Sequence, residues 1–258
     1  MKNMRAVIEA DHASLGTFLS LGSAMTAEAC AVGGFDWLLV DLEHGAGDEK
    51  DMAGQVRAAA AHGAPSVVRV ESAERIRCGR VLDLGAAGVM FPRLNTANEV
   101  REAVRHLRYP PEGDRGVATY HSAAGFGLRP GTLLTANDAT VCIVQIETIE
   151  ALRNVDEIAA VPGVDVLFVG PRDLSSALGV PGQFTSPEYL SALEAVVTAA
   201  KANSIRAGIL AATVENANQC LANGFSFVAI ASDSTFLAKG AQDSVDQVRE
   251  ANGLQAHR

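Results

Sequence analysis

Several features that mark common classes of protein are missing from this 258-residue sequence. Its four cysteines show no C-x-x-C spacing, which argues against zinc and predicts buried, reduced thiols. The net charge is −9 and there is no Lys/Arg cluster, so neither nucleic acid nor an anionic membrane is an expected partner. No apolar run approaches the ~20 residues of a membrane span and no leader is visible, so we expect a cytoplasmic protein that acts on small molecules.

Strand-like and helix-like segments alternate along the whole chain. The strand-like runs span residues 15–19, 35–40, 65–70, 87–91, 141–146, 164–169, 206–210 and 226–230. The segments with helical spacing of apolar residues span residues 24–32, 49–62, 73–84, 97–107, 149–161, 187–203, 214–223 and 234–251. This alternation predicts an α/β fold, a (β/α)₈ TIM barrel, in a single domain that covers residues 1–258.

One segment, residues 108–137, is too long for an ordinary connection. It opens with the turn signal Tyr109-Pro110-Pro111-Glu112-Gly113 and continues through a stretch of small residues. Long loops inside compact domains are usually functional or interfacial. Since the segment comes after the fourth strand, we expect it to rise from the catalytic face and to form one wall of the site.

Charged and polar residues stand where several predicted strands end. The apolar, β-branched run at residues 141–146 is typical of a buried parallel strand, and it ends at Glu147. The alternative is that Glu147 caps the helix beginning near Ile149. The other strand ends carry Asp41, Glu43, His44, Arg69 and the run Gly170-Pro171-Arg172-Asp173-Leu174-Ser175. Each has a possible structural role, but together they predict an active site at the carboxyl ends of the strands.

Two carboxylates on adjacent predicted strands, Glu147 and Asp173, suit a hard divalent cation. Magnesium and manganese take oxygen ligands, typically one or two carboxylates with water and substrate oxygens. No second histidine stands at a strand end, which disfavours zinc. Arg69 offers a planar fork for a carboxylate or an enolate oxygen, and the backbone N–H groups of Arg172 and Asp173 could hold another substrate oxygen.

These groups suit a 2-oxo acid as substrate. The metal would chelate the carboxylate and keto oxygens and, with Arg69, stabilise the enolate formed when a C–C bond breaks or a methyl proton leaves. His44, near Asp41, is the candidate for moving the proton. An imine-forming aldolase is excluded because no lysine ends a predicted strand; the chain has only Lys2, Lys50, Lys201 and Lys239.

Five motifs, taken in order and at their spacing, resemble the HpcH/HpaI aldolase family of metal-dependent class II pyruvate aldolases. They lie at residues 34–44, 67–69, 108–117, 144–148 and 168–175, and the resemblance extends from about Leu15 to Lys239. It implies reversible retro-aldol cleavage of a 4-hydroxy-2-oxo acid to pyruvate, or a hydroxypyruvate-type donor, plus an aldehyde. It also implies Mg²⁺ or Mn²⁺, with Co²⁺ as a further option, and a homo-oligomer, typically a hexamer (dimer of trimers) with exchanged C-terminal helices.

The resemblance also implies roles for individual residues. Glu147 and Asp173 match the metal ligands, Arg69 the enolate-stabilising arginine, and His44 the acid/base histidine. The full predicted set is catalytic His44, Arg69, Asp41 and Asp83; substrate-binding Gln145, Arg69, Arg172, Asp173 and Leu210; and metal-binding Glu147 and Asp173.

Two aspartates need separate predictions. The family pairs its histidine with an aspartate that matches Asp83, which ends the helix after the third strand. Asp83 should therefore lie on the wrong face of its own barrel to meet His44, so the pairing would need another subunit. The alternative is a helix-end aspartate with only local bonds. Asp233, after the eighth strand, is predicted to be a helix N-cap.

Two positions depart from the family pattern. Ser122-Ala123 stands where many relatives carry arginine followed by alanine, which removes a cationic grip on a distal acid group of the aldehyde. Arg172 stands where relatives carry a small residue, and it either adds a cation at the rim or faces solvent. The alternatives left open are an oxaloacetate decarboxylase, a citrate-lyase-like C–C lyase and a noncatalytic 2-oxo-acid-binding barrel.

Overall fold

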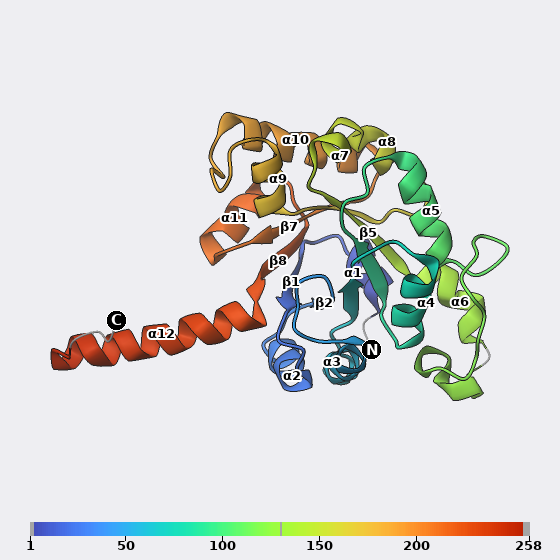
Figure 1. Ribbon diagram of the computed structural model, residues 1–258, viewed down its shortest axis with the longest axis horizontal. Coiled ribbons are helices and arrows are strands. Elements are labelled where there is room, and N and C mark those ends of the chain that lie inside the picture. Colours follow the sequence, from blue (N-terminus) through green and yellow to red (C-terminus); the bar gives the residue numbers. More distant parts are fainter. Residues whose placement is uncertain (1–2, 130, 255–258) are drawn as a thin grey trace.

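The computed structural model describes residues 3–129 and 131–254 of the chain. Parallel strands follow one another in sequence order around a closed barrel, and β1 pairs with both β2 and β8 (Figure 1). The strands are β1 (Ser14–Leu19), β2 (Trp37–Asp41), β3 (Ser66–Arg69), β4 (Gly88–Phe91), β5 (Val141–Ile146), β6 (Val166–Val169), β7 (Arg206–Ala211) and β8 (Phe227–Ser232). The predicted (β/α)₈ barrel is therefore confirmed.

Helices surround the barrel on its outside (Figure 1). They are α1 (Met4–Glu9), α2 (Ala24–Val32), α3 (Glu49–Ala61), α4 (Arg75–Asp83), α5 (Ala97–Leu107), the 3₁₀ helix η1 (Ser122–Gly127), α6 (Thr132–Ala139), α7 (Ile149–Arg153), α8 (Val155–Ala159), α9 (Pro171–Ala177), α10 (Pro187–Ala202), α11 (Val214–Ala222) and α12 (Asp233–Asn252). The single helix predicted over residues 149–161 is instead two helices that meet at Asn154. Four helices were not predicted from the sequence: α1, η1, α6 and α9.

Two capping boxes fix the starts of helices on the side of the barrel where the strands end. At α5 the Thr96 side chain accepts from the N–H of Glu99, and the Glu99 side chain accepts from the N–H of Thr96. Asp48 and Asp51 form the equivalent pair at α3. Each such cap stabilises its helix by about 1 kcal/mol. The loops that leave β2 and β4 are thus anchored at their far ends.

The barrel interior is packed at the amino-terminal ends of the strands. The Trp37 ring stacks on Phe227 with 3.9 Å between ring centroids, and a Cβ added at Gly16 would overlap the Trp37 ring. Met4 and Val7 of α1 are buried in the same inner cluster, so this helix closes that end. Burying one such large apolar side chain stabilises the fold by about 1.5–3 kcal/mol. Apart from Asp83, the charged residues predicted for the site lie at the opposite end of the barrel.

Along β5 the side chains alternate between the two sides of the sheet. Val141 and Ile143 belong to the inner cluster, whereas Cys142 and Val144 pack against the surrounding helices. Because side chains alternate along a strand, Gln145 points toward the barrel interior, on the same side as Val141 and Ile143. All six residues of the strand are buried, as predicted for a strand covered on both faces.

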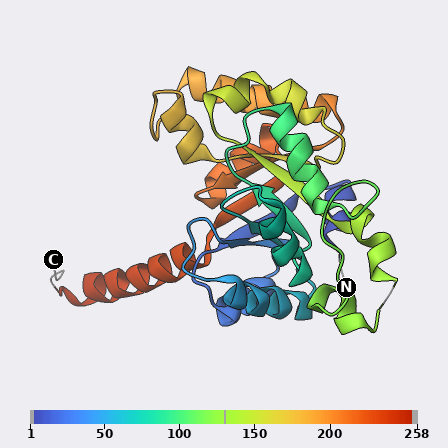
Figure 2. The same ribbon diagram turned by 45° about the vertical axis from the view of Figure 1, so that its right-hand side comes forward.

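The long segment at residues 108–137 does not rise from the catalytic face, and this prediction was wrong. The segment follows α5 rather than β4, so it starts at the amino-terminal end of the barrel. There Arg115 binds Asp83 at the end of α4, and the Tyr109 N–H donates to the Asn137 side chain. A cavity of about 600 Å³ at this end is lined by residues of the segment together with Ser66 and Ala87, at the starts of β3 and β4. Figure 2 shows the segment in green on the outside of the barrel, near the N-terminus.

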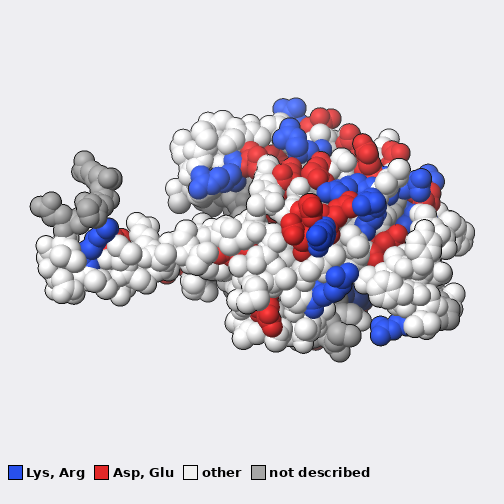
Figure 3. Space-filling model, turned by 60° about the horizontal axis from the view of Figure 1, so that its bottom comes forward, with Lys and Arg blue, Asp and Glu red and all other residues white. Residues whose placement is uncertain are grey.

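Helix α12 projects away from the barrel (Figures 1 and 2). Among its described residues only Asp233 is buried, while Leu237 is 64% and Val248 58% exposed. On the face shown in Figure 3, most of its surface is neither acidic nor basic, unlike the barrel, where charges of both signs are interspersed. An exchange of this helix between subunits of a hexamer stays a prediction.

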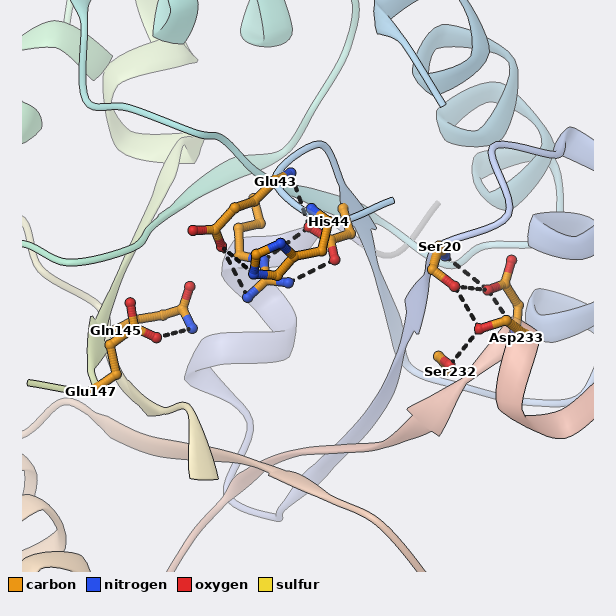
Figure 4. A network of polar contacts seen from close by, with 10 residues as sticks. Ser20, Glu43, His44, Gln145, Glu147, Ser232 and Asp233 are labelled. Carbon is orange, nitrogen blue, oxygen red and sulfur yellow. Dashed lines mark hydrogen bonds and ion pairs between the residues drawn. The ribbon is translucent and has the colours of Figure 1, made fainter. Parts of the chain in front are cut away.

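Asp233 was predicted to be the N-cap of α12, and this prediction was wrong. The N-cap is Ser232, which is still extended and whose hydroxyl accepts from the Thr235 N–H. Asp233 is the first helical residue, and its buried carboxylate accepts from the Ser20 N–H at 2.8 Å and from the Thr26 hydroxyl at 2.8 Å. It thereby ties the start of α12 to the loop after β1, as Figure 4 shows for Ser20.

The four cysteines are free thiols, of which three are buried and Cys30 is half-buried. Burial raises the pKa of the Cys78 thiol to about 12 and that of Cys220 to about 11, which makes both poor nucleophiles. The prediction of buried thiols is therefore right for three of the four. A search of the described helices for one long and apolar enough to cross a membrane finds none.

Candidate active site

The carboxyl ends of the strands surround a cavity of about 890 Å³. Its lining includes the predicted residues Asp41, His44, Arg69, Gln145, Arg172, Asp173 and Leu210. Glu147, directly after β5, contacts this lining through Gln145. The fold therefore brings together every predicted site residue except Asp83.

A buried ion pair connects the ends of β2 and β3. Asp41 and Arg69 are register partners in the parallel pair, and both are the last residues of their strands. The Arg69 Nε donates to Asp41 Oδ1 at 2.9 Å and Nη2 donates to Oδ2 at 2.6 Å. Arg69 Nη1 lies 3.2 Å from Glu43 Oε2, and the guanidinium carbon lies 5.3 Å from the centre of the Phe18 ring. This two-pronged pairing fixes the plane of the guanidinium.

The charge on Arg69 is secure although its side chain is buried. Burial disfavours the cation, but the hydrogen bonds that Arg69 donates to Asp41 and the charges of Asp41, Glu43 and Glu147 outweigh it and raise the Arg69 pKa. Asp41 also accepts from the backbone N–H groups of Glu43 and His44, at 3.1 and 3.2 Å. Asp41 thus both holds the loop after β2 and orients Arg69.

His44 stands at the open side of the cavity, with 68% of its side chain exposed. Its Nε2 lies 3.8 Å from Glu43 Oε2, and Figure 4 shows the two side chains close together. Asp41 binds His44 through the backbone N–H only. Among the described residues, Glu43 is the carboxylate that lies beside the His44 ring and beside Arg69 at once.

Glu147 is buried, with 4% of the residue exposed. Its Oε1 accepts from the Arg93 N–H at 3.0 Å, and its Oε2 accepts from Gln145 Nε2 at 3.0 Å (Figure 4). Burial raises the pKa of the carboxyl to about 7, helped by the charges of Asp173 and Glu43 and opposed by the Arg93 hydrogen bond. These causes disfavour the ionised form of Glu147. A cation bound beside the carboxylate would therefore have a large stabilising effect on that form.

The alternative that Glu147 caps a helix is wrong. The N-cap of α7 is Thr148, whose hydroxyl accepts from the Ala151 N–H at 3.0 Å. The Glu147 carboxylate instead accepts from Gln145 Nε2, as Figure 4 shows.

The space beside Glu147 is kept open by Gly170. A Cβ at this position would lie 2.8 Å from Glu147 Oε2 and 3.3 Å from Gln145 Nε2. Gln145 Oε1 is buried and has no hydrogen-bond partner among the described residues. A buried acceptor without a partner costs free energy, so this oxygen is suited to a ligand or a water molecule. Asp173, in the first turn of α9, lines the same cavity.

A search of the described residues finds no group of three or more His, Cys, Asp or Glu side chains that could hold a metal ion. Glu147 and Asp173, the two predicted metal ligands, stay a prediction that depends on two carboxylates rather than three or more protein ligands. Two carboxylates are the usual protein contribution for Mg²⁺, whose other ligands are waters and substrate oxygens. The donor set fits that metal and does not resemble a closed zinc site.

Asp83 lies at the opposite end of the barrel from His44. Its Oδ1 accepts from Arg115 Nη2 at 2.7 Å and lies 3.4 Å from His121 Nε2. Both partners come from the long segment, 32 and 38 residues further along the chain, so the alternative of only local bonds is wrong. Pairing with His44 of another subunit stays a prediction.

Three contacts in the site involve residues outside the predicted set. The Arg93 N–H holds Glu147, with Arg93 itself at a positive φ of 55°. Phe18 lies under Arg69, and Glu43 joins Arg69 to His44. Of these three residues, Glu43 is the one that the sequence could have revealed, because it lies in one of the motifs that resemble the family. The Arg93 contact is made by a backbone N–H after β4, so no pattern of side chains in the sequence reveals it.

The comparisons with known proteins agree with this geometry. The model of the HpcH/HpaI aldolase/citrate lyase family matches residues 14–240. A hydroxypyruvate/pyruvate aldolase of Paraburkholderia phytofirmans is 44% identical, over 91% of this chain and 92% of that protein. A 2-dehydro-3,6-dideoxy-6-sulfogluconate aldolase of Pseudomonas putida is 41% identical, over 92% and 93%. A 4-hydroxy-2-oxo-heptane-1,7-dioate aldolase of Escherichia coli is 37% identical, over 93% and 92%.

Among solved structures, an HpcH/HpaI aldolase/citrate lyase family protein from Burkholderia cenocepacia superposes with a TM-score of 0.91. It is 39% identical and covers 95% of this chain and 98% of that chain. The barrel with its site at the strand ends is thus that of a metal-dependent carbon–carbon lyase. The chain belongs to the HpcH/HpaI aldolase/citrate lyase family, and it is an aldolase of the class II pyruvate type.

Proposed function

We propose that the protein catalyses the metal-dependent, reversible retro-aldol cleavage of a 4-hydroxy-2-oxo acid to pyruvate, or a hydroxypyruvate-type donor, plus an aldehyde. The observation that carries this proposal is the juxtaposition of a buried acid, Glu147, with Asp173 and the oriented Arg69 around one cavity. Such a set can bind a divalent cation and an anionic intermediate side by side.

Glu147 and Asp173 would hold the cation, Mg²⁺ or Mn²⁺ by the chemistry of the donors. Burial, and then the charges of Asp173 and Glu43, raise the Glu147 pKa; a positive ion would favour the ionised carboxylate, and Gly170 leaves room for it beside Glu147 Oε2. When bound, the metal supplies Lewis-acid polarisation of the 2-oxo group.

Arg69 would bind the oxygen that becomes negatively charged when the C3–C4 bond of the substrate breaks. Its guanidinium lines the cavity and is held in one plane by Asp41, so little reorganisation accompanies the reaction. Removing one oriented donor to such an oxyanion typically costs about 10²–10³ in rate. Gln145, through its unpartnered Oε1, would accept a hydrogen bond from a hydroxyl group or water in the cavity.

His44 would move the proton. In cleavage, its neutral imidazole takes the proton of the 4-hydroxyl group, the C3–C4 electron pair passes to the enolate, and the aldehyde leaves. A proton from the histidine or from water then adds to C3 and gives the methyl group of pyruvate. The position of His44 at the open side suits a group that exchanges protons with solvent.

The experiment is metal removal followed by readdition. Pyruvate release from a 4-hydroxy-2-oxo acid should stop after exhaustive chelation and return on adding Mg²⁺ or Mn²⁺. Turnover that persists without metal would contradict the proposal. Arg69→Ala should lose turnover by orders of magnitude while metal binding, measured by calorimetry, is retained. A protein that only binds a 2-oxo acid, the third alternative from the sequence, would have no turnover to lose.

A further inference from the structure

Arg172 is a cationic residue in the lining of the cavity, and the proposed reaction assigns it no role. It is the second residue of α9, next to Asp173, and it lines the same cavity as His44, Arg69 and Gln145. The residue is exposed, and its guanidinium makes no hydrogen bond or ion pair within residues 3–129 and 131–254. Only its backbone oxygen is used, as an acceptor for Ser175 and Ser176.

The other arginine of the cavity cannot take a second anion in the same way. Arg69 already gives Nε and Nη2 to Asp41 and has Nη1 beside Glu43. Lysine is absent from the described lining of the cavity. A carboxylate on the part of the substrate away from the 2-oxo group therefore has one unused arginine to bind, at Arg172.

The size and the remaining walls of the cavity agree with a substrate that extends beyond pyruvate. About 890 Å³ is available, and the wall formed by the α9–α10 connection, α10 and β7 carries Phe184, Leu190 and Leu210. Those side chains can cover a short carbon chain, but they offer no counter-charge for an acid group. The counter-charge for such a group would come from Arg172, on the neighbouring helix.

On the basis of the aldol reaction proposed above, we propose that Arg172 is a specificity-determining residue that binds a carboxylate on the aldehyde part of the substrate. The preferred substrates are then 4-hydroxy-2-oxo acids with a second carboxylate. A guanidinium binds a carboxylate through two parallel hydrogen bonds, which also orients the aldehyde for attack.

The test compares two aldehydes of equal chain length, 4-oxobutanoate and butanal, in the synthetic direction with pyruvate. The variants are Arg172→Ala and Arg172→Lys, and the matched control is Arg153→Ala, an exposed arginine on α7 outside the cavity lining. We expect Arg172→Ala to lower kcat/KM for 4-oxobutanoate by about tenfold or more, the value of one charged hydrogen bond, and to leave butanal within about twofold. Arg172→Lys should retain part of the preference, and the control should retain all of it.

Two results would overturn the inference. Equal losses for both aldehydes, with a raised KM for pyruvate, would mean that Arg172 binds the carboxylate of the 2-oxo acid. No loss for either aldehyde would mean that Arg172 only faces solvent.

A binding measurement separates failure of this inference from failure of the proposed reaction. Calorimetry with 2-oxopentanedioate and 2-oxopentanoate compares two 2-oxo acids that differ in one distal carboxylate and need no aldol step. The protein should prefer the dicarboxylate, and Arg172→Ala should abolish that preference. If no aldehyde reacts but this preference follows Arg172, the aldol proposal fails and the arginine site stands; if the preference does not follow Arg172, the arginine site fails.

Discussion

In the metal-free protein, Glu147 should make the fold less stable as the pH rises. Its pKa is raised from 4.5 to about 7 because the carboxyl is buried and lies near the charges of Asp173 and Glu43. The protonated form therefore favours the folded state. The contribution of protonated Glu147 to the free energy of unfolding is fully present below 4.5, the pKa in the unfolded state. It is lost as the pH rises from there to about 7, by about 3 kcal/mol in all.

Glu147→Gln tests this reasoning because the amide keeps the shape of the side chain and cannot ionise. Urea unfolding of chelator-treated protein would be measured at about pH 5 and about pH 8, with Glu150→Gln, an exposed change on α7, as the control. The free energy of unfolding of the unmodified chain should fall relative to Glu147→Gln between the two pH values, by about 3 kcal/mol. Glu150→Gln should show the same fall as the unmodified chain.

Adding Mg²⁺ at the higher pH provides a second arm of the experiment. The cation should restore stability to the unmodified chain by binding the folded state, and it should do so much less in Glu147→Gln. A difference between the two proteins that does not change with pH would refute the reasoning, because it would show that ionisation of Glu147 costs the fold nothing.

Three further predictions concern the catalytic groups and the barrel interior. His44→Ala should abolish retro-aldol turnover, yet retain much of the decarboxylation of oxaloacetate, which forms the enolate without deprotonating a hydroxyl; loss of both activities would argue against a proton-transfer role. Gly170→Ala should weaken Mg²⁺ binding in calorimetry with little change in unfolding temperature, because its Cβ would lie 2.8 Å from Glu147 Oε2; unchanged affinity would place the cation elsewhere. Gly16→Ala should destabilise the fold by about 1–3 kcal/mol through overlap with the Trp37 ring, measured by urea unfolding, and an unchanged midpoint would contradict that packing.

Much of the barrel could be predicted because each strand is a short buried run and each long helix an amphipathic one. Helices α2 and α5 match their predicted bounds, since apolar spacing and, for α5, the Thr96–Glu99 cap act within a few residues. The short helices α6 and α9 were missed because eight and seven residues are too few to show a clear apolar period, and α6 buries none of its residues. The direction of residues 108–137 was wrong because the prediction counted the segment from a strand instead of from the intervening helix.

In the site, as in the fold, features that follow from the local sequence were predicted, whereas features that depend on long-range contacts were not. Residues that end strands were placed correctly, because the fold alone brings the carboxyl ends of parallel strands together. What joins them was less predictable: the Arg93 N–H on Glu147 and the place of Glu43 between Arg69 and His44 require coordinates in three dimensions. The cap assigned to Asp233 failed for a related reason, since its partners Ser20 and Thr26 lie at the other end of the chain.

The charges of the site explain why this end of the barrel needs a ligand. The charges of Asp41, Glu43 and Glu147 act on the buried guanidinium of Arg69, which is already committed to Asp41 and Glu43. Glu147 has no ion-pair partner among the described residues, and burial together with the charges of Asp173 and Glu43 raises its pKa. Evolution toward stability alone would replace one of these acids with an apolar side chain. A site that keeps them gains from a divalent cation and an anionic substrate together, because each offsets the charge that makes the other difficult to bind.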